Sequence, residues 1–121
     1  MSEARMTEIL ETLNPVSTTP VNYTTTASYV DIGKLDAAGK TRVVYTIANL
    51  HATNGIKWKV LASIDDSTYV ELEAEATVAG LASSSWIADA TEASYRYFKC
   101  QVKDEVGAAH GTAQIRGYAK M

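Results

Sequence analysis

Apolar and polar residues alternate through the segment from residue 56 to residue 78, with one short interruption. The interruption is Asp65-Asp66-Ser67, and the alternation resumes after it. Period-two alternation on both sides of a short polar break predicts a β-hairpin with one buried face. The residues expected on that face are Ile56, Trp58, Val60, Ala62 and Ile64 in the first strand and Val70, Leu72, Ala74, Ala76 and Val78 in the second.

Charge pairing favours one register for this hairpin. A three-residue loop at Asp65-Asp66-Ser67 places Lys57 opposite Glu75, and opposite charges across a ladder contribute about 0.2–1 kcal/mol each. The same register pairs Trp58 with Ala74, Val60 with Leu72 and Lys59 with Glu73. A loop two residues longer keeps the faces but pairs Lys57 with Thr77. The shorter loop needs a left-handed residue, a conformation that Asp66 tolerates.

Short alternating segments separated by turn signals continue along the chain from residue 21. Strands are expected at residues 21–26, 28–33, 41–50, 85–88, 95–105 and 112–120, besides the hairpin. Residues 41–50 are apolar on both sides, which is typical of a central strand covered on both faces. Seven or eight strands with turns every 8–12 residues predict an all-β fold, an antiparallel β-sandwich or a closely related barrel.

The first twenty residues differ from the rest. An apolar stripe with i, i+3, i+4, i+7 spacing predicts a short amphipathic helix, which Asn14-Pro15 ends. About twelve residues make a marginal helix in water, so this one needs a surface to lie on. We therefore expect an N-terminal arm at residues 1–20 and a sandwich domain at residues 21–121. The stripe consists of Met6, Ile9, Leu10 and Leu13.

Composition excludes several classes of function. A chain of 121 residues with 46% hydrophobic residues fits one folded domain. The net charge of −3 and the lack of a basic run argue against a nucleic-acid partner. No segment resembles a signal peptide or reaches membrane-spanning length, so we expect synthesis in a cytoplasm and no membrane partner. Cys100 is the single cysteine and falls on an apolar strand side, as expected of a small buried hydrophobe.

Candidate catalytic and metal-binding residues are few. His51 and His110 lie in expected loops without further ligands at zinc spacing. Asp65-Asp66 lacks the alternating ligands and glycine of a calcium loop, so a turn is the preferred interpretation. Glu71, Glu73 and Glu75 share one strand side facing lysines, as on an ordinary solvated sheet face. The sequence predicts no enzyme, no metal site and no cofactor.

Tyrosines form the remaining candidate surface. The chain has seven tyrosines and one phenylalanine, and tyrosine favours positions that are half buried and half wet. Tyr95, Tyr97 and Tyr118 are expected in an outward row, with Tyr69 on another exposed edge. Such a row suits a protein interface or a sugar-stacking platform. Together with Met6, Ile9, Leu10 and Leu13, these three tyrosines are the expected partner-binding residues.

The region from residue 57 to the C-terminus resembles small β-sandwich virion proteins of tailed bacteriophages. The similarity lies in "KVLASIDDSTYVELEAEATV", a following Trp-bearing strand and "ASYRYFKCQVKDEVGAAHGTAQIRGYAKM". The usual Asp-Gly turn of the pattern is Asp65-Asp66 here. Such proteins include head-decoration (cement) proteins and tail-associated modules. The resemblance implies a non-enzymatic structural part whose N-terminal arm docks on neighbours.

The sequence thus favours a virion structural protein, most specifically a capsid decoration protein that stabilises the head. Its expected partners are the major capsid protein or other virion proteins and further copies of itself, with a trimer as one form. Its expected location is the virion, after synthesis in the host cytoplasm. The alternative is a carbohydrate-binding or receptor-binding tail module that uses Tyr95, Tyr97 and Tyr118.

Overall fold

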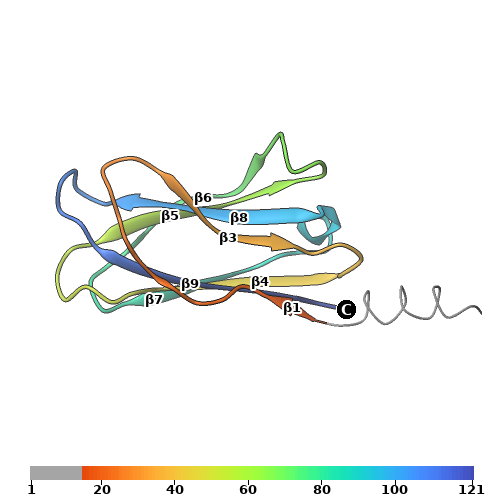
Figure 1. The fold of residues 1–121 in the computed structure, drawn as a ribbon, viewed down its shortest axis with the longest axis horizontal. Coiled ribbons are helices and arrows are strands. Elements are labelled where there is room, and N and C mark those ends of the chain that lie inside the picture. The colour runs from red at the N-terminus through yellow and green to blue at the C-terminus, as the bar shows by residue number, and fades with distance from the viewer. Residues whose placement is uncertain (1–14) are drawn as a thin grey trace, which may run out of the picture.

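Two antiparallel β-sheets stacked face to face make up the described part of the protein (Figure 1). The structure is a computed structural model, in which residues 15–121 are described. The helix expected within residues 1–20 lies outside these residues. The strands are β1 (Val16–Ser17), β2 (Asn22–Thr24), β3 (Val30–Asp36), β4 (Arg42–Asn49), β5 (Ile56–Ser63), β6 (Val70–Val78), β7 (Ser83–Ile87), β8 (Tyr97–Asp104) and β9 (Thr112–Lys120), with one 3₁₀ turn, η1 (Glu92–Ser94).

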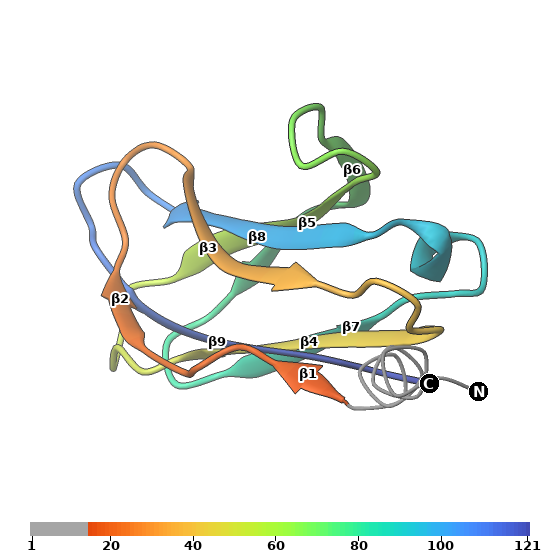
Figure 2. The same ribbon diagram turned by 45° about the vertical axis from the view of Figure 1, so that its right-hand side comes forward.

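The strand order is that of a jelly roll. Sheet A has the order β1-β9-β4-β7, with β2 also paired to β9, and sheet B has the order β3-β8-β5-β6. Successive strands from β2 to β9 therefore cross between the sheets, except at the β5–β6 hairpin, as in double-sheet jelly rolls. Figure 2 shows the two layers and the edge at β1 and β2. The predicted antiparallel sandwich is confirmed.

The predicted count of seven or eight strands is wrong, because nine strands are present in the described region. The added strand is β1, which precedes Pro20 and pairs with the C-terminal end of β9 through Val16 and Ala119. Proline lacks the backbone N–H that a ladder needs, and the chain resumes pairing with β9 only at β2. Residues 1–20, expected as an arm, therefore include a short stretch of sheet A.

The core lies between the sheets and is built from the inward sides of the strands. The predicted inward faces of β8 and β9 are confirmed, since Phe98, Cys100 and Val102 and, on β9, Ala113 and Ile115 are buried. Tyr45 of β4 crosses the core, and its hydroxyl donates a 2.6 Å hydrogen bond to the carbonyl of Gly33 in β3. Burial raises the pKa of the Cys100 thiol well above its usual range, in keeping with a buried apolar role.

Two glycines accommodate Tyr45, Gly117 beside its ring and Gly33 at its hydroxyl. Gly117 lies opposite Tyr45 in the ladder between β9 and β4, and a Cβ at Gly117 would lie 2.5 Å from the ring. Gly33 adopts φ +69°, a left-handed conformation at an irregularity of β3 that turns its carbonyl toward Tyr45. Glycine adopts this conformation without steric cost.

Next to its loop the β5–β6 hairpin has the predicted register, with Leu61 opposite Glu71 and Ala62 opposite Val70. Farther from the loop, Lys57 pairs with Thr77, Trp58 with Ala76 and Val60 with Glu73, so the predicted pairs Lys57–Glu75, Trp58–Ala74 and Val60–Leu72 are wrong. Ladder irregularities on either side of Val60 change the offset along the strands. Lys57 still reaches Glu75 diagonally, with Nζ 3.0 Å from Oε1. Charge attraction therefore did not require direct opposition, and the irregularities at Val60 set the pairing of Lys57.

Burial follows the prediction on β5 and departs from it on β6. Ile56, Trp58, Val60 and Ala62 are buried, but Ile64 is 74% exposed. On β6 only Val78 is buried, and Leu72 is half-buried. β6 is one of the two edge strands of sheet B and bends away from sheet A (Figure 2). The opposite sheet therefore covers only part of its apolar side, at Val78 and Leu72.

β4 is central in sheet A, as predicted, but only one of its faces is covered. Val43, Tyr45 and Ile47 are buried, whereas Val44 and Ala48 are half-buried. The expectation of coverage on both faces is therefore wrong. Its outward apolar residues belong to a surface of sheet A that is described below.

Candidate interaction surfaces

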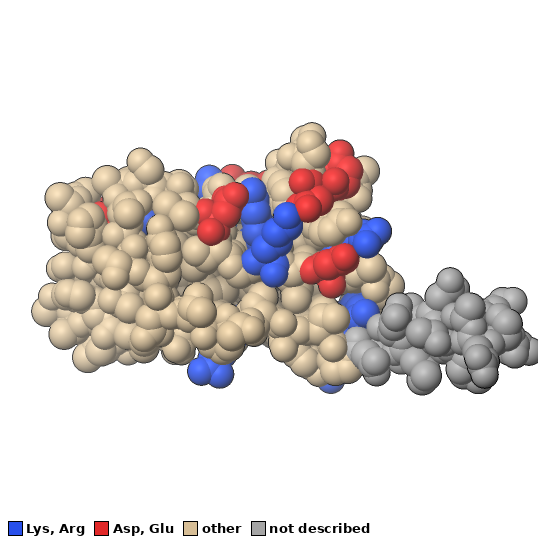
Figure 3. Space-filling view, in the orientation of Figure 1, with Lys and Arg blue, Asp and Glu red and all other residues tan. Residues whose placement is uncertain are grey.

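Lysines and tyrosines interleave on the outer face of sheet B. Lys59 Nζ lies 4.4 Å and Lys103 Nζ 4.9 Å from the ring centroid of Tyr29. Lys99 Nζ lies 4.1 Å from that of Tyr69. A cation over an aromatic ring at exposed sites contributes about 0.5–1 kcal/mol. In Figure 3 acidic and basic side chains gather together over the sheet B half of the molecule.

Glu75 of the edge strand β6 forms ion pairs with two lysines on this face. Lys57 and Lys103 lie directly opposite each other in the ladder between β5 and β8. Glu75 lies 3.0 Å from the Lys57 ammonium and 3.9 Å from that of Lys103. The Tyr29 hydroxyl also donates to the Glu75 carboxylate. This hydrogen bond and the one to Lys57 lower the pKa of Glu75, while burial and Glu75 raise that of Tyr29.

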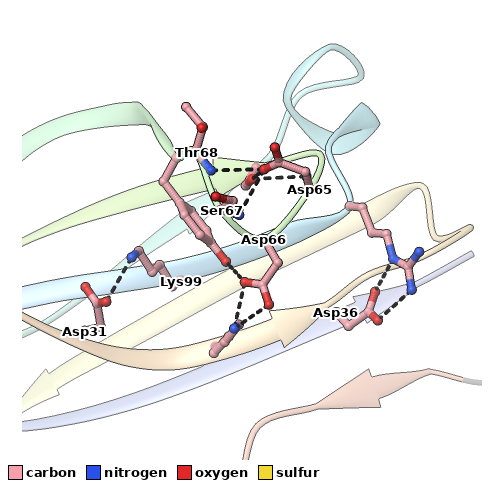
Figure 4. Close-up of polar contacts among 11 residues, drawn as sticks. Asp31, Asp36, Asp65, Asp66, Ser67, Thr68 and Lys99 are labelled. Carbon is pink, nitrogen blue, oxygen red and sulfur yellow. Dashed lines mark hydrogen bonds and ion pairs between the residues drawn. The ribbon is translucent and has the colours of Figure 1, made fainter.

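The loop between β5 and β6 is held by its own aspartates (Figure 4). Asp65 accepts hydrogen bonds from the backbone N–H groups of Ser67 (2.9 Å) and Thr68 (3.0 Å). Asp66 adopts φ +60°, so its predicted left-handed conformation is confirmed. Its carboxylate accepts a hydrogen bond from Tyr69 and pairs with Lys34 at 2.7 Å. These contacts show that the two aspartates stabilise the turn, as the preferred interpretation of the sequence expects.

Ion pairs also stabilise the other edge of sheet B, where β3 lies beside β8. Lys99 lies 2.9 Å from Asp31, and the Arg96 guanidinium donates two 3.1 Å hydrogen bonds to Asp36 (Figure 4). These contacts lower the pKa of both carboxyls. Acidic and basic side chains on this face are thus paired with their near neighbours.

Acid is expected to weaken sheet B. The carboxyls of Asp31, Asp66 and Glu75 have lowered pKa values when folded, so the folded chain binds fewer protons than the unfolded chain. Their contribution is fully present above the ordinary carboxyl pKa of about 4 and is lost as pH falls through the lowered values. We expect Tm, followed by circular dichroism, to drop below about pH 4.

Glu75→Gln should flatten that drop, because it removes one of these linked groups. Glu73→Gln is the matched control, since Glu73 lies on the same strand and forms no ion pair among the described residues. Equal acid profiles for the two variants would contradict the role given to Glu75.

The histidines support loops. His51 Nδ1 accepts hydrogen bonds from the backbone N–H groups of Thr53 (3.1 Å) and Asn54 (2.9 Å). His110 Nδ1 lies 2.9 Å from the buried carboxylate of Asp104, which also accepts a 2.6 Å hydrogen bond from Thr25. In the described region, no three His, Cys, Asp or Glu side chains are grouped to hold a metal ion.

The three tyrosines of the predicted outward row lie apart. Tyr97 points outward from β8 in sheet B, and Cζ of Arg96 lies 4.9 Å from the centroid of its ring. Tyr118 points outward from β9 in sheet A and is 39% exposed. Tyr95 follows η1 and is half-buried against the core. Because the outer faces of the two sheets point in opposite directions, these tyrosines cannot form one stacking platform.

The outer face of sheet A carries an apolar row that the sequence did not reveal. Tyr118, Val44 and Ile87, on three adjacent strands, are consecutive partners in the ladders; these three residues are the apolar row. Ile87 is 72% exposed. A shallow hollow of about 270 Å³ lies at the row, with Arg42 and Lys120 on its rim. The alternation of Trp86 inward and Ile87 outward was the one available signal.

Charge separates the two outer faces. The described strands of sheet A contain no Asp or Glu, and their charged residues are Arg42, Arg116 and Lys120. Sheet B carries both signs, paired as described above. Sheet A therefore presents an apolar row with a basic border, whereas the charges of sheet B largely satisfy one another.

The predicted arm residues are not placed by the structure. Met6, Ile9, Leu10 and Leu13 lie outside the described residues, so their expected partner-binding role stays a prediction.

Among the described residues, no helix has the length and apolar character to cross a membrane.

Comparison with known proteins gives similarity at the level of the fold. No protein-family model matches the chain, and no curated protein matches its sequence. A pilus chain from Bacillus endospore appendages, described as disulfide-linked, has a TM-score of 0.52 at 14% identity, with 88% of each chain covered. The Yersinia pseudotuberculosis-derived mitogen has a TM-score of 0.51 at 10% identity, with 90% of this chain and 87% of the mitogen covered.

A third similar structure comes from a virus. A chain of the T13 viral particle of IBDV has a TM-score of 0.51 at 10% identity over 88% of this chain. This chain spans 31% of that longer viral chain. The three similar proteins have different descriptions, and at these identities they support the β-sandwich fold of this chain and no more.

Proposed function

We propose that this chain is a structural subunit of a bacteriophage virion, and specifically a capsid decoration protein without enzymatic activity. The observation that carries the proposal is the outer face of sheet A, where an exposed apolar row lies on strands free of acidic residues. Exposed apolar residues gathered in a patch are typical of protein interaction sites. Association with the major capsid protein and with further copies of this chain would cover that face.

The resemblance of residues 57–121 to small virion proteins of tailed bacteriophages supports the same role. Similar folds in a viral particle and in a pilus are consistent with it, because both are assemblies of many subunits. Cys100 is 0% exposed, so assembly of this chain would rely on non-covalent contacts rather than on disulfides like those of the pilus.

The two outer faces are suited to different surroundings. On sheet B the charged side chains form ion pairs and cation–π contacts with one another, which makes this face suited to solvent. Sheet A has few charges to desolvate, so its burial against a neighbour is less costly. In the virion, sheet A would therefore face the protein shell and sheet B the medium.

Particles that lack this chain test the proposal. We expect deletion of its gene to leave heads that assemble but break at lower temperature, because a decoration protein adds contacts between capsid subunits. Added full-length protein should restore the stability and appear as ordered density on the head by electron cryo-microscopy. Density at the tail tip, or glycan binding on an array, would contradict decoration and favour the carbohydrate- or receptor-binding alternative.

A further inference from the structure

The apolar row lies at the end of sheet A where the described chain begins. Ser17 of β1 pairs with Tyr118, which extends the row to the edge of the sheet. Val16 pairs with Ala119, so β1 lies beside the C-terminal end of β9, as Figures 1 and 2 show. The described chain thus begins within one or two residues of the row, and residues 1–14 precede it.

The direction of β1 points away from the row at the place where the described chain begins. Followed backwards from Ser17 to Val16, β1 runs toward the end of β9 and off the sandwich. Pro15 disfavours a helical backbone at Asn14, so the sequence predicts that the extended direction continues. Folding back onto the row of the same sheet would need a sharp reversal at this point. A second copy is the better-placed acceptor.

The chemistry of the segment complements the row. Its predicted apolar stripe matches the exposed Ile87 and Tyr118 and the half-buried Val44, and three glutamates against one arginine match the basic border of Arg42 and Lys120. Twelve helical residues span about 18 Å. Four adjacent strands span about 14 Å, so such a helix would cross sheet A from β1 to β7. The charged residues of the segment are Glu3, Arg5, Glu8 and Glu11.

We propose that residues 1–14 of one copy dock on the apolar row of a second copy through Met6, Ile9, Leu10 and Leu13. Donor and acceptor are different surfaces, so the contact is head-to-tail and closes into a ring when the rotation permits. A trimer is one such ring. The inference rests on the proposed function in one respect, because this contact would join copies of the chain on a particle. The contact itself can be tested without particles.

Full-length variants in sedimentation velocity experiments test the acceptor. Ile87→Asp should weaken self-association by at least about 30-fold, as expected when an apolar anchor is lost. Ile64→Asp is the matched control, since Ile64 is 74% exposed against 72% for Ile87 but lies after β5 of sheet B. Equal effects of the two substitutions, or a wild-type chain that is monomeric at every concentration, would overturn the proposal.

Mixing tests the pairing of donor and acceptor. Leu10→Asp should be monomeric with an intact row, and Ile87→Asp should be monomeric with an intact N-terminal segment. Combined, they should form heterodimers through the one remaining functional contact. A mixture that stays monomeric would overturn the docking of Leu10 on the Ile87 surface.

A cysteine pair separates docking in trans from docking in cis. In the full-length variant Leu10→Cys/Ile87→Cys, mild oxidation should give disulfide-linked oligomers on a non-reducing gel. Cys100 is buried and should not take part. A disulfide within single chains, or no disulfide at all, would overturn docking on a second copy. Self-association through the row without any density on particles would instead leave this inference standing and contradict the proposed function.

Discussion

Tyr45→Ala is expected to lower the free energy of unfolding by about 3–5 kcal/mol, the usual cost of deleting a large buried aromatic side chain. Tyr45 is 0% exposed and joins the sheets, since its ring lies over Gly117 of sheet A and its hydroxyl reaches Gly33 of sheet B. Its loss leaves a cavity and an unpaired carbonyl. Small domains are stable by only about 5–15 kcal/mol, so the change is a large fraction of the total.

Two further substitutions separate the contributions. Tyr45→Phe keeps the ring and leaves the Gly33 carbonyl without its donor, which should cost about 1–3 kcal/mol. Tyr118→Ala is the matched control, because it removes the same atoms from the outer face of the neighbouring strand and should cost less than about 1 kcal/mol. Urea titrations measure all three. Comparable losses for Tyr45→Ala and Tyr118→Ala would contradict the assignment of inner and outer faces.

Trp58→Ala is expected to cost about 3–5 kcal/mol. Trp58 is 3% exposed and lies in sheet B between Ala76 of β6 and Val102 of β8. Its indole N–H is buried and has no acceptor among the described residues. Trp58→Phe should therefore cost less than half as much, because a phenyl ring refills most of the space and the unpaired donor is removed.

Lys59→Ala provides the comparison one residue along the same strand. Lys59 points outward over Tyr29, and loss of an exposed contact of this kind should cost less than about 1 kcal/mol. Thermal unfolding followed by far-ultraviolet circular dichroism, a signal that does not rely on tryptophan fluorescence, measures the stability of each variant. A loss for Lys59→Ala equal to that for Trp58→Ala would show that β5 is turned the other way.

Local alternation was a reliable guide wherever a strand is covered by the opposite sheet. Phe98, Cys100 and Val102 of β8, and Ala113 and Ile115 of β9, are buried as their spacing predicts. The same kind of alternation in β6 was misleading, because β6 is an edge strand that bends away from sheet A. Alternation reports a pleated strand with one apolar side, but whether that side is covered depends on a distant segment.

Candidate surfaces were harder to predict than strands. Tyr97 and Tyr118 each face outward as expected, yet the chain crosses from sheet B to sheet A between β8 and β9. Outward therefore means opposite directions for the two residues. The apolar row shows the converse, since Val44, Ile87 and Tyr118 are far apart in sequence and meet only through the pairing of β7, β4 and β9.

The sequence by itself determined the all-β class, the inward faces of β5, β8 and β9, the turn role of Asp65-Asp66 and the buried position of Cys100. These features depend on periodicity, turn chemistry and side-chain polarity, which are local. Only the tertiary structure decided the jelly-roll strand order, the shift of register along the β5–β6 hairpin, the Tyr45–Gly33 link and the contrast between the outer faces. Those features depend on which distant strands become neighbours, and backbone pairing between strands carries no local signature of its partner.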